Sequence, residues 1–340
     1  MPPAALSEVL APADTRATVR RLSGLAQCAQ LLASGVLGIV AAVPIARYLW
    51  VVAHRITFPF ELEWMEGGSV EVVRRVVEGH NIYGPPSMGF TPWPYPPLYF
   101  WLSAGVSKFT GVGFFPLRLV SVCASLVVLW VLYRMVRGAT GDHIAGLLAA
   151  GVYATTYSLS GAWADIGRVD SLFLALALGA IAVARRAEST RAGALVGLLF
   201  FLSFFTKQDG LLIALPVVGW MLVARRRAGI VALGVLGGLV ALSTVVLDAL
   251  SHGWYQYYVF SELSSQGIVP ENWEDFWRYD VLHPLAPLVL LTLVALPLLI
   301  AGRRWWSVDW RAAGFWAAAT AGLLGAAWGI DRMIVISILI

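Results

Sequence analysis

The sequence is poor in charge: only 13% of its 340 residues are Asp, Glu, Lys or Arg, whereas 59% are hydrophobic. A typical soluble domain carries roughly 25% charged residues. A chain this apolar cannot keep the surface of a globule hydrated, so a water-soluble protein is excluded. The composition predicts an all-α polytopic transmembrane bundle whose solvent is lipid.

Cysteine is nearly absent, and no sign of nucleic-acid binding is present. Cys28 and Cys123 both lie inside apolar segments and lack metal-ligand spacing, which predicts small buried hydrophobic residues. The net charge of +4 comes from short basic clusters between apolar runs. That pattern is typical of cytoplasmic loops, so we expect a lipid bilayer and no nucleic acid as partner.

Apolar runs divide the chain into a tail at 1–27, a transmembrane region at 28–332 and a short end at 333–340. A spanning helix needs about 20 apolar residues, and we expect about nine or ten spans. The clear runs are 28–52, 114–133, 143–161, 170–184, 191–205, 209–224, 229–250, 284–301 and 311–328. The run from Met333 is too short to span, which predicts an incomplete further span in a truncated chain.

Two further segments predict interfacial helices. As a helix, Tyr95–Thr110 would reach only about 24 Å, less than the ~30 Å bilayer core. Treating it as interfacial places the arginine clusters on the side of the basic tail, which the positive-inside rule assigns to the cytoplasm. Ser69–Gly79 has valines on one face and charges on the other, as expected for a helix on the membrane surface. The outer loops are then 53–113, 161–170, 206–209 and 251–283.

The first outer loop contains three carboxylates within six residues, Glu61, Glu63 and Glu66. A carboxylate beside the lipid headgroups can deprotonate an acceptor hydroxyl or amine while a lipid phosphate leaves. The alternative is a solvated acidic loop. Glu66 and Glu63 are therefore candidate catalytic bases.

The second outer loop contains Asp165, Arg168 and Asp170. Asp170 begins the next apolar run, where an N-cap carboxylate would accept hydrogen bonds from free backbone N–H groups. Arg168 is a candidate fork for a phosphate, and a plain polar turn is the alternative.

The third outer turn contains Lys207, Gln208 and Asp209 between two apolar runs. A lysine on the outer side departs from the positive-inside trend. Either a bound anionic ligand or snorkelling of the amine to lipid phosphate accounts for it.

The long outer loops are rich in tryptophan and tyrosine, among them Trp64, Trp93 and Tyr95. Aromatic side chains at this depth normally form a belt at the membrane interface.

Several short fragments occur in a defined order along residues 28–260. They are Glu66-Gly67, Gly79-His80-Asn81-Ile82-Tyr83, Tyr95-Pro96-Pro97-Leu98-Tyr99, Arg118-Leu119, Arg168-Val169-Asp170 and Thr206-Lys207-Gln208-Asp209-Gly210. Together they resemble the GT-C superfamily of integral-membrane glycosyltransferases. The nearest branch contains protein O-mannosyltransferases, the lipid-A aminoarabinose transferase and bacterial family-39-like proteins.

The resemblance implies a polyprenyl-phosphate sugar donor, a catalytic acid in the first outer loop and a short helix starting at the Pro-Pro pair. Many relatives carry an adjacent Asp-Glu pair where this chain reads Met65-Glu66, so Glu66 or Glu63 would serve as base. Arg168 and Lys207 are the candidates for the donor phosphate. Other candidate site residues are Asp165, Asp170, Tyr95, Gln208, Asp209 and Arg118.

We therefore expect a hexosyl- or pentosyltransferase in a bacterial inner membrane, with a cytoplasmic N-terminus and a periplasmic active site. Its acceptor is an unidentified lipid, glycan or protein. No cofactor or metal is required, although Glu63, Asp165 and Asp170 would suit a shared hard cation. A transporter or flippase of lipid-linked sugars is less favoured, since the charges lie at helix ends and no repeat is evident. A scaffold in an envelope-polymer complex is the third reading, because the usual aspartate is missing.

Overall fold

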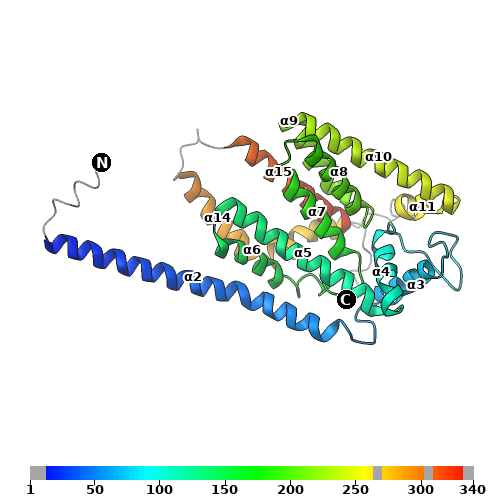
Figure 1. Ribbon diagram of the computed structural model, residues 1–340, viewed down its shortest axis with the longest axis horizontal. Coiled ribbons are helices and arrows are strands. Elements are labelled where there is room, and N and C mark those ends of the chain that lie inside the picture. Colours follow the sequence, from blue (N-terminus) through cyan, green and yellow to red (C-terminus); the bar gives the residue numbers. More distant parts are fainter. Residues whose placement is uncertain (1–12, 263–269, 302–308, 332–340) are drawn as a thin grey trace. The chain divides into compact units, whose positions relative to one another are not determined.

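The computed structural model describes residues 13–262, 270–301 and 309–331, and these ranges are built from helices (Figure 1). The predicted all-α class is confirmed. The elements are α2 (Ala13–Arg55), α3 (Met65–Val77), α4 (Leu98–Thr110), α5 (Phe114–Thr140), α6 (His143–Thr155), α7 (Asp170–Ala184), α8 (Thr190–Phe204), α9 (Gly210–Ala224), α10 (Arg226–Ser251), α11 (Trp254–Gln256), η1 (Tyr257–Ser261), α13 (Pro270–Asp275), η2 (Phe276–Leu282), α14 (Ala286–Ala301) and α15 (Trp310–Asp331).

Each predicted apolar run forms a helix, and the two predicted interfacial segments form α3 and α4. Three stretches are long and apolar enough to cross a membrane: Gln27–Arg55, Phe114–Thr140 and Arg226–Ser251. A bent pair, Pro270–Leu282 with Ala286–Ala295, would make a fourth. The four helices α6 to α9 are shorter, so the count of nine or ten spans stays a prediction. The expected further span at 333–340 lies outside the described residues.

The chain forms two compact units. The first comprises Met1–Trp50 and Leu132–Thr156. In it, α2 and α6 approach closely, because a Cβ added at Gly151 would lie 2.7 Å from the carbonyl oxygen of Ala41. Glycine at such a crossing lets two helix backbones touch, as is common between membrane helices.

The second unit comprises Val51–Val131 and Tyr157–Ile340. Within it, α8 packs between α7 and α10, and α15 packs against α9 (Figure 1). Gly193 and Gly197 of α8 again allow a close crossing, since an added Cβ would lie 2.3 Å and 2.5 Å from the carbonyl oxygens of Ala228 and Ala232. The short helices α3 and α4 contact each other in the same unit.

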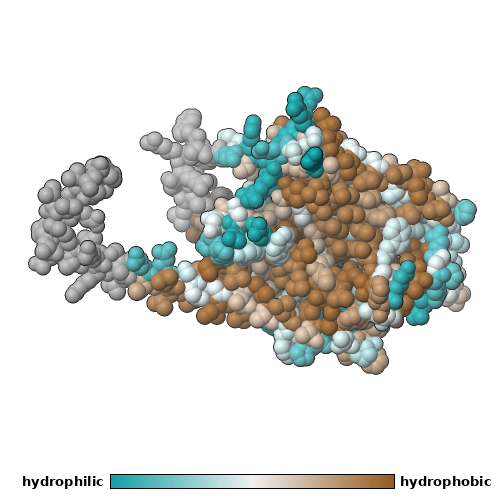
Figure 2. Space-filling view, in the orientation of Figure 1, coloured by the Kyte–Doolittle hydropathy of each residue, from teal (hydrophilic) through white to brown (hydrophobic). Residues whose placement is uncertain are grey.

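The surface carries large apolar side chains along whole helices, and apolar residues dominate the face seen in Figure 2. The exposed residues include Leu31, Ile39, Val245, Leu250 and Leu291. Exposing so large an apolar surface to water is unfavourable, so the chain is an integral membrane protein. Cys28 and Cys123 are exposed, which corrects their expected burial. In a lipid-embedded helix, an apolar sequence position can face the acyl chains as well as the core.

Candidate functional site

The four loops predicted to face outward meet one another in the second unit. The backbone N–H of Gly167, in the second loop, donates to the Glu66 carboxylate in the first. The amide nitrogen of Gln208, in the third turn, donates to the carbonyl oxygens of Pro94 at 2.6 Å and Val259 at 3.0 Å. Segments far apart in the sequence therefore form one polar assembly, and Gln208 tethers three of them.

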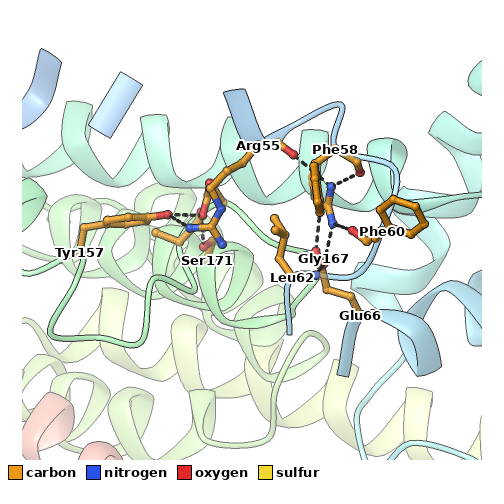
Figure 3. A network of polar contacts seen from close by, with 11 residues as sticks. Arg55, Phe58, Phe60, Leu62, Glu66, Tyr157, Gly167 and Ser171 are labelled. Carbon is orange, nitrogen blue, oxygen red and sulfur yellow. Dashed lines mark hydrogen bonds and ion pairs between the residues drawn. The ribbon is translucent and has the colours of Figure 1, made fainter. Parts of the chain in front are cut away.

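A fully buried arginine, Arg118, joins several parts of this assembly, and Figure 3 labels its partners Phe58, Phe60 and Glu66. Arg118, at the start of α5, binds Glu66 through two contacts, Nε to Oε1 at 2.9 Å and Nη2 to Oε2 at 2.7 Å. Its remaining N–H groups donate to the carbonyl oxygens of Arg55 at 3.0 Å, Phe58 at 2.6 Å and Phe60 at 2.7 Å. A guanidinium has five N–H groups, and all five have an acceptor here.

The carboxylate of Glu66 is equally saturated. Besides Arg118, the backbone N–H groups of Leu62 and Gly167 donate to it at 2.7 Å and 2.6 Å, and its side chain is fully buried. Burial raises the pKa of Glu66, but the hydrogen bonds from Arg118, Leu62 and Gly167 outweigh it and lower the pKa below its ordinary value. Its role as base stays a prediction, and this geometry argues against it, because no lone pair is left for an acceptor proton.

The helix that carries Glu66 begins earlier than predicted, at Met65 rather than Ser69. Gly67 and Gly68 are therefore both helical. The missing side chain at Gly68 leaves room for Trp93, because a Cβ added there would lie 2.5 Å from the Trp93 ring. The earlier start puts Glu66 in the first helical turn, where the helix dipole favours a negative charge.

A second network holds Asp165, whose side chain is 1% exposed, and Figure 3 labels two of its members, Arg55 and Tyr157. Arg55 lies 3.6 Å from its Oδ2, the Tyr157 hydroxyl donates to its Oδ1 at 2.8 Å, and Arg55 also donates to Tyr157. Burial raises the pKa of Asp165, and the Arg55 charge only partly opposes it. The sequence did not single out Arg55 or Tyr157, since each reads as an ordinary helix-end residue.

A third group of charges is partly accessible, and we call it the ion-pair cluster: Glu63, Arg168, Asp170, Lys207 and Asp209. Arg168 lies 3.2 Å from Glu63 and 3.0 Å from Asp170. Lys207 lies 2.8 Å from Asp170 and 3.7 Å from Asp209. The exposed fractions of these side chains run from 10% for Arg168 to 25% for Asp170. These side chains are thus less deeply buried than those of Arg118, Glu66 and Asp165.

The predicted N-cap role of Asp170 is wrong. Asp170 is the first residue of α7, and its two oxygens accept from Arg168 and Lys207 rather than from backbone N–H groups. Burial lowers the pKa of Lys207, whereas the nearby Asp170 and Asp209 carboxylates raise it. The effect of the carboxylates is larger, so the pKa lies above its ordinary value. The lysine therefore stays protonated, and the cluster presents two permanent cations.

Glu63 differs from Glu66 in the lone pairs that remain. Its Oε2 accepts from the backbone N–H of Met65 at 3.0 Å, and its Oε1 faces Arg168. A carboxylate has about four acceptor positions, so these two partners leave capacity for a third. The Glu63 side chain is 16% exposed. Of the two predicted bases, Glu63 is the one that an acceptor can approach.

Tyr95 lies beside the ion-pair cluster, with its ring stacked on Trp93 at a centroid distance of 6.4 Å. Its carbonyl oxygen accepts from the Tyr83 hydroxyl at 2.8 Å. Burial raises the pKa of Tyr95, although the neighbouring Lys207 opposes the shift. The phenol therefore stays protonated at neutral pH and can act as a donor.

The possible hard-cation site is not assembled in the described residues. Asp165 turns to Arg55 and Tyr157, whereas Glu63 and Asp170 bind Arg168. Within the described ranges, no three His, Cys, Asp or Glu side chains are grouped so that they could hold a metal ion.

The fold and the site define a class: an all-helical integral membrane protein with a polar, charged site built by loops at the helix ends. Residues 94–247 match the model of the family described as dolichyl-phosphate-mannose-protein mannosyltransferase. The match confirms the predicted resemblance and supports a membrane glycosyltransferase of the GT-C type. It includes Arg118, Arg168 and Lys207, whereas Glu63 and Glu66 precede it. Neither a curated protein nor a solved structure was found to match the chain.

Proposed function

We propose that this chain transfers a sugar from a polyprenyl-phosphate donor to an acceptor at the periplasmic face of a bacterial inner membrane. The observation that carries the proposal is the ion-pair cluster, where a partly exposed carboxylate, Glu63, pairs with Arg168, and Asp170 joins Arg168 to a second cation, Lys207. Transfer from a lipid phosphate needs a base for the acceptor and positive charge for the departing phosphate. The family match over residues 94–247 supports the transferase class.

In the proposed step, the Glu63 carboxylate takes the proton of an acceptor hydroxyl or amine. The freed electron pair attacks the anomeric carbon from the face opposite the phosphate. The bond between that carbon and the phosphate oxygen breaks, and its electron pair leaves with the polyprenyl phosphate. Arg168 and Lys207 offset the charge that develops on this oxygen, and the sugar is transferred with inversion.

Arg118 and Glu66 act as positioning residues in this proposal. Together they fix the segment 58–60, the start of α3 and the loop at Gly167. Glu63 lies three residues before Glu66 in the same segment. A rigid support of this kind keeps a reacting group within a few tenths of an ångström of its working position.

The orientation across the membrane is also part of the proposal. The site is built from the loops before α5 and α7 and from the turn between α8 and α9, whereas the basic clusters lie near or just after the C-terminal ends of α5, α7 and α9. These clusters are Arg134 and Arg137, Arg185 and Arg186, and Arg225 to Arg227. The positive-inside rule then places the clusters and the N-terminus in the cytoplasm and the site in the periplasm.

The test is transfer of radiolabelled sugar from a panel of polyprenyl-phosphate hexoses and pentoses, with purified protein in lipid nanodiscs. We expect Glu63→Gln to lower turnover at least about 100-fold, the usual contribution of a general base. The matched control is Glu71→Gln, an exposed carboxylate in α3, the helix that follows Glu63, and it pairs with Arg74. It should retain wild-type turnover.

The outcomes separate the readings. Unchanged turnover in Glu63→Gln would remove Glu63 as the base and leave the transferase standing. Absence of turnover by the wild type with every donor would overturn the proposed function. Movement of a fluorescent lipid-linked sugar between leaflets without any transfer would favour a flippase instead.

A further inference from the structure

A row of aromatic side chains leads from α3 to the ion-pair cluster. Trp64 follows Glu63 in the chain, and its ring lies 5.7 Å from that of Trp93. Trp93 in turn stacks on Tyr95, with ring centroids 6.4 Å apart and planes inclined by 27°. We call Trp64, Trp93 and Tyr95 the aromatic row.

The row is held in place by backbone contacts at its cluster end. Gln208, the neighbour of Lys207 and Asp209, donates to the carbonyl oxygen of Pro94, between Trp93 and Tyr95. The Tyr83 hydroxyl donates to the carbonyl oxygen of Tyr95. The turn that supplies a cation to the cluster therefore also fixes the aromatic row.

The backbone at Gly68 lies directly against the row. An added Cβ there would meet three atoms of the Trp93 ring between 2.5 and 2.8 Å. A side chain larger than hydrogen would push Trp93 away from α3. The fit therefore holds Trp93 between Trp64 and Tyr95.

The far end of the row is open. Trp64 is 52% exposed. An indole is one of the largest apolar side chains, so an exposed one offers an apolar surface that a ligand can cover. A third indole, Trp163, has its face covered by the Arg168 guanidinium at 3.9 Å. Apolar ring faces and two cations thus border the same site. A sugar phosphate has matching parts, since its phosphate is anionic and one face of its ring carries C–H groups.

We propose that the aromatic row is the subsite that takes the sugar ring of the lipid-linked donor. This inference rests on the proposed function and adds to it the residues that recognise the sugar. In such a donor the phosphate is bonded directly to the anomeric carbon. A phosphate held by Arg168 and Lys207 therefore places the ring beside them, where Tyr95 begins the row.

The experiment measures binding of two ligands to protein in nanodiscs: polyprenyl phosphate, and the same lipid carrying the sugar that the wild type transfers. The wild type should bind the sugar-bearing lipid more tightly. In Trp64→Ala that preference should fall about 10-fold, the usual loss on truncating an anchoring aromatic residue. Affinity for bare polyprenyl phosphate should stay unchanged, and Trp64→Phe should restore part of the preference.

Trp310→Ala is the matched control, because Trp310 is 72% exposed at the start of α15 and belongs to a different region. It should leave both affinities unchanged. An equal loss for both lipids in Trp64→Ala would show an interface anchor and overturn the inference. A rise in the KM of the acceptor alone would assign the row to the acceptor and also overturn it. Failure of the proposed function appears separately, as a wild type without turnover.

Discussion

Replacing Glu66 by glutamine tests whether this residue supports the site or performs the chemistry. The carboxylate accepts four hydrogen bonds, two from Arg118 and one each from Leu62 and Gly167. An amide has one acceptor oxygen and one NH2 donor group. However the amide is turned, two of the four N–H groups would face another donor. The Arg118 charge, which is fully buried, would also lose its counter-ion.

The size of the effect follows from these losses. Each buried donor without an acceptor costs about 1–3 kcal/mol, and breaking a buried ion pair by removing one partner costs about 3–5 kcal/mol in all. We expect Glu66→Gln to lower the free energy of unfolding by roughly 3–5 kcal/mol. Turnover should also fall, because less of the protein is folded and because the loops that Glu66 holds would be displaced. The control Glu71→Gln should stay within about 0.5 kcal/mol of wild type.

The assay is unfolding in one detergent, followed by tryptophan fluorescence, beside turnover of the same preparations. The double variant Glu66→Gln/Arg118→Met should be less destabilised than the sum of the single changes, since it removes both members of the pair. A Glu66→Gln protein that unfolds like the wild type but has no turnover would refute this reasoning. Glu66 would then be the base.

Three further outcomes follow from the same contacts. Hydrogen bonds hold the pKa of Glu66 below its ordinary value of 4.5. The ionised carboxylate therefore stabilises the fold fully above pH 4.5, and this stabilisation is lost as the pH falls through the lower pKa of the folded state. Glu66→Gln should flatten this acid dependence of the unfolding temperature. Lys207→Gln leaves Asp170 with one cation and should raise the KM for the donor about 10-fold, the worth of one charge-assisted hydrogen bond, in steady-state assays. Gly151→Leu would force a side chain against the backbone of Ala41 and should destabilise the protein by about 1–3 kcal/mol, seen as a lower unfolding temperature.

The helices were predictable because apolar runs of membrane length leave the backbone no other way to satisfy its hydrogen bonds. The start of α3 was not, because the amphipathic pattern begins only at Ser69 and the close approach of Trp93 to Gly68 is a tertiary contact. The cap assigned to Asp170 failed for a related reason: local rules consider neighbouring N–H groups but not Lys207, which lies 37 positions away. The charged residues of the site could be predicted from the sequence. Their ion-pair partners could not, because tertiary packing determines which side chains come into contact.

The distance in sequence between the partners of Glu66 has a consequence for biosynthesis. Arg118 follows it by 52 positions and Gly167 by 101. At a translation rate of about 5–20 residues per second, roughly 5–20 s pass before the last of these partners is made. During that interval an unpaired carboxylate is present in a nascent membrane segment. The first loop must therefore wait in water or headgroups and can settle against the bundle only after α5 and the loop before α7 have emerged.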